Sequence, residues 1–335
     1  MSLAACAGSS PAMPPSTSSF AAAGAKETVK IKQFADLPQY ADYYGPAGIT
    51  LGPDKALWIT DDIDQDFGES AVVRVLPNGQ QAKIYYYQGL STEGSSLGGI
   101  ATGPDGNLWV TDSYNSQILR LTPSGTYTGY RTNISPYEIT LGPDHALWFT
   151  TYSEVGRITT SGKITTYGVG DGAYGIAAGP DKALWFTETF TNAIGRITTH
   201  GKYVAYSNGI STGALPNAIA AGPDGALWFT EPGAGKIGRI TTSGTVTEYS
   251  KGITPTEEPT GIAAGPDGAM WFTEYETYDS YEIRDSKIGR IAMNGKVTEY
   301  SQISSTSAPG AIVKGDNDEL WFVESYADET GRIKL

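Results

Sequence analysis

Acidic side chains recur at one position of this sequence and are its most regular source of chemistry. The position three residues after each tryptophan holds Asp61, Asp112, Thr151, Glu188, Glu231, Glu274 and Glu324. Carboxylates brought to one place repel one another unless a cation or hydrogen-bond donors compensate their charge. A cation site is one interpretation of this set. For most of its members we favour the other, that they accept hydrogen bonds from nearby backbone N–H groups and stabilise each repeat, because a functional site should break a repeat.

Histidine and cysteine chemistry is restricted in this chain. The two histidines, His145 and His200, fall in predicted turns, so we expect both on the surface. The single cysteine excludes an intramolecular disulfide and a cysteine-based zinc site. A formal net charge of −13 argues against nucleic acid as a partner and favours metal cations or cationic ligands. No apolar run reaches about 18 residues, so we expect no membrane-spanning helix.

A sevenfold internal repeat predicts the elements that must position these side chains. The segment AIAAGPDGALWFTE (218–231) recurs with small changes around Trp58, Trp109, Trp148, Trp185, Trp228, Trp271 and Trp321. A second segment, such as KIGRITTSGTVTEY (236–249), follows each copy and supplies one Arg per repeat. We expect this Arg to have a structural role and to pair with a carboxylate or carbonyl oxygen between neighbouring repeats. Each unit predicts four short strands joined by turns rich in Pro, Asp and Gly. Four strands in about 40 residues are typical of one propeller blade. We therefore predict an all-β, seven-bladed β-propeller of four-stranded antiparallel blades over residues 26–335.

The two ends of the chain are predicted to close this ring. The last unit stops at Leu335, after its third strand, and so lacks a fourth. Residues 28–34, TVKIKQF, match the fourth-strand pattern seen in GKVTEY (295–300). We expect this N-terminal strand to pair onto the last blade, which leaves no unpaired sheet edge at the junction.

One position of each repeat should lie at the mouth of the central channel, and its residues differ between repeats. Eleven residues before each tryptophan stand Ala47, Gly98, Tyr137, Tyr174, Asn217, Thr260 and Gly310. Because this position breaks the symmetry, we predict that a small-molecule or peptide-like ligand binds at the mouth. The expected contacts are Tyr137, Tyr174, Asn217 and Ala47.

Inserted segments add acidic and aromatic residues near this mouth. The first unit carries residues 61–69, the sixth carries residues 275–282, and Tyr85–Tyr87 follow the first unit. Such loops suit an apolar or cationic ligand, or equally a protein-binding rim. The alternating Asp residues of 61–69 suggest Ca²⁺, but the Gly does not match the EF-hand pattern. We favour a solvated acidic loop there.

Residues 1–25 are rich in Ala, Ser, Pro and Gly and predict a flexible tail. Within it, Leu3-Ala4-Ala5-Cys6 resembles a bacterial lipobox, in which the Cys is lipidated after signal-peptide cleavage. This predicts a truncated lipoprotein signal and a bacterial, extracytoplasmic protein, periplasmic or membrane-anchored, with a lipid anchor at Cys6. A chance match of four residues is the alternative.

The repeated units GITLGPDKALWITD and KIGRITTSGTVTEY resemble the virginiamycin B lyase (streptogramin lyase) family from about residue 26 to 335. The resemblance implies elimination across an ester C–O bond of type B streptogramins, with Mg²⁺ held by two Glu. A His general base lies in a Glu-Pro-His-Gly-Ile segment of that family, and the matching segment here is Glu258-Pro259-Thr260-Gly261-Ile262. The resemblance therefore implies Mg²⁺ at Glu258 and Glu274.

The general-base position, however, is Thr260, and the family's axial His and Tyr of two other blades are replaced by Asn217 and Ala47. A Thr hydroxyl without activation does not act as a base near neutral pH, whereas His does. A remaining base would be Glu258, Glu257, Tyr137 or Tyr174.

Three functions follow from these features. The first hypothesis is a ligand-binding propeller without His-based catalysis. The second is a lyase that uses another base, and the third is an interaction module of the cell envelope. We favour the first and expect a monomer.

Overall fold

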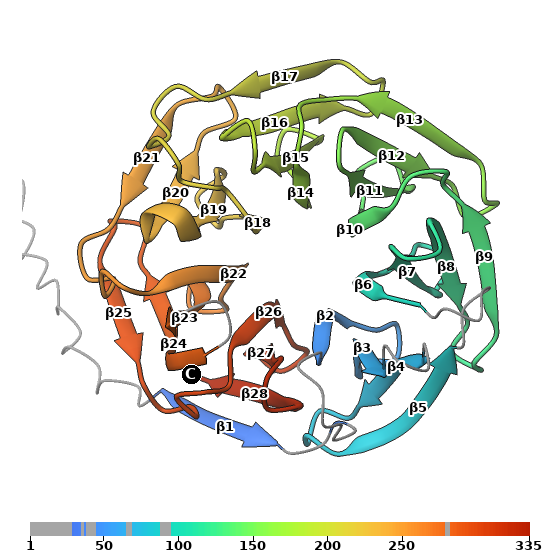
Figure 1. Ribbon diagram of the computed structural model, residues 1–335, viewed down its shortest axis with the longest axis horizontal. Helices are drawn as coiled ribbons and strands as arrows, with labels where there is room; N and C mark the ends of the chain where they lie inside the picture. The colour runs from blue at the N-terminus through green and yellow to red at the C-terminus, as the bar shows by residue number, and fades with distance from the viewer. Residues whose placement is uncertain (1–28, 35–36, 38–44, 65–68, 88–94, 279–281) are drawn as a thin grey trace, which may run out of the picture.

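The computed structural model describes residues 29–34, 37, 45–64, 69–87, 95–278 and 282–335. In this part of the chain the strands form seven four-stranded antiparallel sheets arranged in a ring (Figure 1). The predicted seven-bladed β-propeller is confirmed. The one helix among the described residues is a short 3-10 turn, η1 (Pro232–Ala234). None of the helices in the described part is long and apolar enough to cross a membrane.

Each of the first six blades uses four consecutive strands, with the innermost strand first. Blades 1 to 3 consist of β2 (Pro46–Leu51), β3 (Leu57–Asp64), β4 (Glu69–Val75) and β5 (Gln81–Tyr87); β6 (Leu97–Thr102), β7 (Leu108–Asp112), β8 (Gln117–Leu121) and β9 (Tyr127–Arg131); and β10 (Pro136–Leu141), β11 (Leu147–Thr151), β12 (Glu154–Ile158) and β13 (Ile164–Gly168). Blades 4 to 6 consist of β14 (Ala173–Ala178), β15 (Ala183–Glu188), β16 (Ala193–Thr198) and β17 (Tyr203–Tyr206); β18 (Ile219–Ala221), β19 (Leu227–Glu231), β20 (Lys236–Ile240) and β21 (Val246–Tyr249); and β22 (Glu258–Ala264), β23 (Met270–Tyr278), β24 (Glu282–Ile291) and β25 (Val297–Tyr300).

Blade 7 is closed by the N-terminal strand, as predicted. It consists of β26 (Pro309–Lys314), β27 (Glu319–Glu324), β28 (Glu329–Lys334) and β1 (Lys30–Phe34), in that order from the axis outward (Figure 1). Strand β1 pairs antiparallel with β28 over its whole length. The ring of Phe34 stacks on Trp321 with centroids 5.4 Å apart, and Gln33 Nε2 donates to Glu324 Oε2 at 2.7 Å.

The Asp of each GPD turn contributes more than turn geometry. In blade 5, Asp224 accepts hydrogen bonds from Trp228 Nε1 at 3.1 Å and Arg239 Nε at 2.7 Å. The same three-residue arrangement holds blades 1, 3, 4 and 6 together internally. We expected the repeated Arg to pair between blades, and for these five blades that expectation is wrong. Both partners belong to one blade because the GPD turn lies beside the third strand.

The tryptophans also join neighbouring blades. Trp228 of blade 5 is fully buried in a cluster with Ile262, Met270 and Phe272 of blade 6. Its ring also stacks on Tyr249, the last residue of β21, with centroids 5.5 Å apart. Each blade therefore buries its Trp against the next one, which makes the ring a continuous apolar core.

Candidate functional site

A β-bulge in the innermost strand brings the predicted site residues to the channel mouth. In blade 3, the two residues Tyr137 and Glu138 lie opposite the single residue Thr150 of β11. The same register shift occurs in blades 1, 2, 4, 6 and 7. The bulge lets the first of the two residues line the mouth while the second lines the channel beneath it.

Threonine hydroxyls hold these bulges in place. Thr150 Oγ1 accepts a hydrogen bond from the N–H of Glu138 at 3.2 Å and donates to the carbonyl oxygen of Tyr174 in the next blade. Equivalent donor–carbonyl pairs are Thr60–Gly98, Thr111–Tyr137, Thr187–Asn217, Thr230–Thr260 and Thr273–Gly310. The mouth residues are therefore set on a backbone that neighbouring blades fix by hydrogen bonds.

Three predicted ligand contacts lie together in one pocket. Tyr137, Tyr174 and Asn217 line a cavity of about 390 Å³ over blades 3 to 5, together with side chains that include Tyr152, Phe190 and Leu215. The rings of Tyr137 and Tyr174 have centroids 5.9 Å apart, and those of Tyr152 and Phe190 are 5.8 Å apart. Phe190 is 69% exposed and Tyr174 is 42% exposed. We call this cavity the aromatic pocket.

The mouth position of blades 1, 2 and 7 carries small residues. Ala47 is exposed and does not line the aromatic pocket. Its counterparts in blades 2 and 7 are glycines, Gly98 and Gly310. This one position is thus asymmetric around the ring, with aromatic residues in blades 3 and 4 and Ala or Gly in blades 1, 2 and 7.

Thr260 uses its hydroxyl within the fold. Its Oγ1 donates to the carbonyl oxygen of Pro309 in blade 7 at 3.0 Å and lies 2.9 Å from Thr273 Oγ1. Among the described residues, the hydrogen-bond partners of this hydroxyl are carbonyl and hydroxyl oxygens and not a carboxylate or an imidazole. The position that the family resemblance assigns to the general base therefore holds a group that joins two blades.

The two carboxylates implied as Mg²⁺ ligands lie on neighbouring, paired strands but differ in burial. In the antiparallel pair β22–β23, Glu258 lies opposite Tyr275 and Pro259 lies opposite Glu274. Glu258 is thus the neighbour of the residue that pairs with Glu274, next to the β-bulge of β22.

Glu258 is half-buried and accepts from Thr277 Oγ1 at 3.2 Å, whereas Glu274 is fully buried. Among the described residues no group of three or more His, Cys, Asp or Glu side chains is arranged to hold a metal ion. Mg²⁺ at Glu258 and Glu274 stays a prediction of the resemblance.

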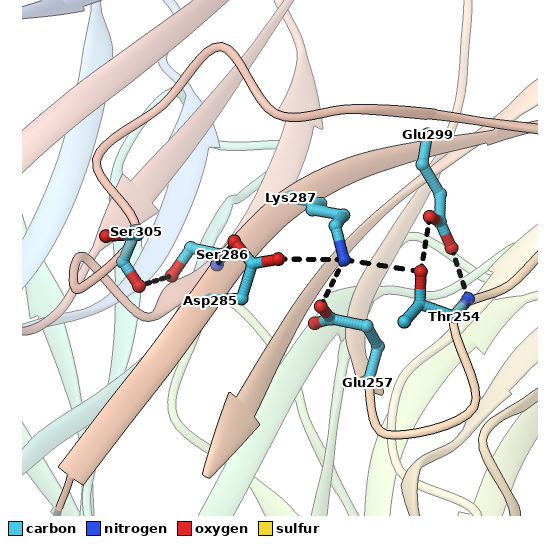
Figure 2. A network of polar contacts seen from close by, with 7 residues as sticks. All are labelled: Thr254, Glu257, Asp285, Ser286, Lys287, Glu299 and Ser305. Atoms are coloured by element: carbon cyan, nitrogen blue, oxygen red, sulfur yellow. Dashed lines mark hydrogen bonds and ion pairs between the residues drawn. The ribbon is translucent and has the colours of Figure 1, made fainter.

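Glu274 lies opposite Lys287 in the strand pair β23–β24. Lys287 is the centre of a network of polar contacts (Figure 2). Lys287 Nζ forms ion pairs with Glu257 and, at 2.9 Å, with Asp285, and it donates to Thr254 Oγ1 at 3.3 Å. Glu299 accepts from the N–H and the hydroxyl of Thr254. Neither carboxylate oxygen of Glu274 has a hydrogen-bond partner among the described residues.

Burial, together with the charges of Glu299 and Glu257, raises the pKa of Glu274 to about 9. The group therefore keeps its proton at neutral pH.

Blade 5 repeats this arrangement, which favours a structural origin. Lys236 pairs with Glu248 at 2.6 Å, and both contact Ser211. Glu231, the counterpart of Glu274, is likewise fully buried, and burial and the charge of Glu248 raise its pKa to about 8. A feature shared by two blades follows the repeat, so it does not distinguish Glu274 as a unique site.

Two other members of the acidic set accept hydrogen bonds, from side chains more than from the backbone N–H groups that the favoured interpretation expected. Asp112 accepts from Asn115 and Gln117, and Glu188 accepts from Tyr203 and Thr191. The donors are mostly side chains of the same blade. These carboxylates stabilise the ends of their strands.

Replacing Glu274 tests its environment through the pH dependence of stability. Its folded pKa of about 9 exceeds the ordinary value of 4.5, so unfolding releases a proton and stability falls as pH rises between these two values. We expect the wild type to lose up to about 4 kcal/mol between about pH 5 and about pH 8 through this group. Thermal melts of Glu274→Gln should show a flatter pH profile and a higher melting temperature at the higher pH.

The matched control is Glu231→Gln, whose smaller pKa shift predicts the same change with a smaller size. A wild-type stability that is equal at the two pH values contradicts a buried, uncompensated carboxyl. A rise in wild-type stability on adding Mg²⁺ that Glu274→Gln lacks supports the metal prediction instead.

The suggested Ca²⁺ site at 61–69 falls partly outside the described residues. Among the described side chains, Asp62 accepts from Ser70 Oγ at 2.8 Å, from the N–H of Leu97 at 2.9 Å and from Ser96 Oγ at 3.1 Å. It therefore links blades 1 and 2.

The inserted segments of blades 1 and 6 extend the hairpins β3–β4 and β23–β24 beyond the length of their counterparts. Tyr85–Tyr87 were expected near the mouth, and this expectation is wrong. They belong to the outermost strand β5, where Tyr85 is buried against Trp58 with ring centroids 5.1 Å apart. The two histidines lie as predicted, exposed and in turns.

Glu138 is a candidate residue that sequence reasoning missed. It follows the mouth position in β10, where the other six blades carry Gly48, Gly99, Gly175, Ala218, Gly261 and Ala311. A comparison of this position across the repeats contained the signal. Burial in the channel raises the pKa of Glu138 to about 7, with the N–H of Ile139 opposing the shift in part.

Comparison with known proteins adds to this geometry. The model of one protein family matches residues 29–171 and 84–335, which together span the propeller. The chain belongs to the virginiamycin B lyase family. A crystal structure of virginiamycin B lyase from Staphylococcus aureus is 34% identical, with a TM-score of 0.78, and the match covers 92% of this chain and all of that one. No curated protein sequence matches the chain.

Two further structures carry the same relationship. A streptogramin B lyase is 30% identical with a TM-score of 0.78, covering 92% of this chain and 98% of that one. A catalytically inactive histidine-to-alanine variant of the Staphylococcus aureus lyase with quinupristin is 32% identical with a TM-score of 0.76, covering 92% of this chain and 100% of that one.

Proposed function

We propose that this member of the virginiamycin B lyase family binds an apolar, peptide-like ligand in the aromatic pocket and does not open its ring. One observation carries the proposal: the protein has a pocket that can hold such a ligand, but its channel mouth lacks the histidines that the family resemblance implies. That pocket is lined by Tyr137, Tyr174 and Asn217. At the mouth, the hydroxyl of Thr260 donates a hydrogen bond to the carbonyl oxygen of Pro309.

The pocket supports binding on its own chemistry. Its walls are mainly aromatic and aliphatic, with few polar groups such as the amide of Asn217, and its volume of about 390 Å³ suits a drug-sized group. Exposed rings such as Phe190 are unfavourable in water, so covering them with an apolar ligand is favourable.

The positions of the two histidines support the absence of turnover. Neither histidine lies at the mouth, since His145 and His200 are exposed in turns elsewhere. The related Staphylococcus aureus lyase is catalytically inactive as a histidine-to-alanine variant, and that variant has a structure with quinupristin. Loss of the base and retention of ligand are therefore compatible within this fold.

Calorimetric titration with quinupristin tests the binding half of the proposal. We expect saturable binding at one site per chain, with a negative heat-capacity change because apolar surface is buried. No saturation up to the solubility limit would contradict the proposal and favour the alternative that this protein is an interaction module of the cell envelope.

The cellular location belongs to the same proposal. The lipobox-like segment ending at Cys6 supports an extracytoplasmic, lipid-anchored protein, and it lies outside the described residues. A ligand-binding propeller outside the cytoplasm would meet such peptide-like molecules before they enter the cell.

A further inference from the structure

The channel below the aromatic pocket holds one acidic side chain in otherwise apolar walls. A cavity of about 490 Å³ runs along the axis and is lined by the innermost strands of all seven blades. Its lining is mainly Ile, Ala, Gly and Val, with Glu138 as its one acidic residue and Lys314 as its one basic residue. A single carboxylate in such walls is costly unless it is protonated or meets a cation.

The carboxylate of Glu138 lies directly beneath the aromatic pocket. Tyr137 and Asn217 line the pocket, and the residues that follow them, Glu138 and Ala218, line the channel. Glu138 also lies near enough to Tyr174 for its charge to help raise the pKa of that phenol. The carboxylate rests against Gly99, where an added Cβ would lie 2.8 Å from Glu138 Oε2.

The fold supplies no cation at this depth among the residues that line the channel. Lys314 stands three residues beyond Ala311, the counterpart of Glu138 in blade 7. At about 3.3 Å per residue this places it about 10 Å farther along the channel wall. Lys314 already pairs with Asp318 at 3.5 Å.

We infer that Glu138 together with the rings of Tyr137 and Tyr174 forms a subsite for the protonated amine of a ligand. The carboxylate supplies an ion pair in a medium of low dielectric, and aromatic faces attract ammonium groups. The net charge of −13 draws cations toward the mouth. This inference deepens the proposed function, since the subsite continues the aromatic pocket downward.

Phenethylamine and its neutral counterpart 2-phenylethanol are suitable probes, with dissociation constants measured by ligand-observed NMR titration. We expect the wild type at about pH 8 to bind the amine at least about tenfold more tightly than the alcohol. Glu138→Gln should remove this preference and leave alcohol binding unchanged. The matched control is Asp171→Asn, an exposed acid beside pocket residue Gly172, which should alter amine affinity less than about twofold.

The wild type provides a second test that needs no variant. Because the pKa of Glu138 is raised to about 7, its ionised fraction falls roughly 30-fold from about pH 8 to about pH 5.5, and amine affinity should fall with it. The other titratable groups near this site are Tyr137, Tyr174 and, at the far end, Lys314. Burial raises the pKa of the Tyr174 phenol further above this pH range.

Two results overturn the inference: equal affinity for amine and alcohol at about pH 8, or unchanged amine affinity in a folded Glu138→Gln. Quinupristin titrated into the same samples separates this failure from that of the proposed function. If quinupristin still binds, the aromatic pocket stands and only the amine subsite is lost.

Discussion

A chain that begins at residue 35, and so lacks β1, should melt roughly 5–15 °C below the full-length protein. Strand β1 pairs with β28 over five residues, and Phe34 stacks on Trp321. Losing these hydrogen bonds and this apolar contact removes about 3–5 kcal/mol. It also leaves β28 as an open sheet edge, so aggregation should increase. Differential scanning calorimetry with light scattering measures both effects.

The matched control is a chain that begins at residue 26, which lacks the Ala- and Ser-rich tail and keeps β1. Its melting temperature should equal that of the full-length protein. If the chain without β1 melts at the same temperature as this control, blade 7 does not depend on its N-terminal strand and the account of ring closure is wrong.

Replacing both Tyr137 and Tyr174 by Ala should weaken quinupristin binding by at least about 30-fold. The two rings form one wall of the aromatic pocket, and their backbones are fixed by Thr111 and Thr150. The substitutions therefore remove contact surface with little effect on the fold. The loss should be seen in the calorimetric dissociation constant while the melting temperature changes little.

Tyr86→Ala is the matched control for this prediction. Tyr86 is 54% exposed on β5, the outermost strand of blade 1, and does not line the pocket. Its removal should leave quinupristin affinity unchanged. An affinity that is equal in all three proteins would place the ligand elsewhere on the propeller.

The blade architecture could be predicted because the repeat itself encodes it. Each Trp is fully buried and most are held by the Asp of a GPD turn, so the same residues must recur in each blade. The closing strand was predictable for the same reason, because the missing fourth strand had a match at the other end of the chain. The pairing partner of the repeated Arg could not be predicted in this way, because it depends on which turn lies beside the third strand.

The site was predictable only where one position differs between otherwise equal repeats. That comparison found Tyr137, Tyr174 and Asn217, which the structure brings into one pocket. It overlooked Glu138 because the bulge exposes two successive residues to the channel, and a strand with regular alternation exposes one. Phe190 and Leu215 come from short connections whose paths the repeat does not specify.

The electrostatic environment of the acidic set could not be predicted from the sequence and became evident only in the structure. Spacing alone places Glu231 and Glu274 at equivalent positions, but it does not show that both are fully buried next to a Lys and a second Glu. That environment makes them structural groups with raised pKa values, and it sets the stability of the protein against high pH.

The most direct test of the central claim, binding without ring opening, is incubation of the protein with quinupristin in Mg²⁺ and, in parallel, in EDTA. Intramolecular elimination opens the ring without changing its mass, so liquid chromatography with fragmentation mass spectrometry must separate the two forms. We expect quinupristin that co-purifies with the protein to be recovered in its cyclic form under both conditions. Accumulation of the linear form with the unmodified protein, in Mg²⁺ but not in EDTA, would contradict the account and identify the protein as a lyase with another base.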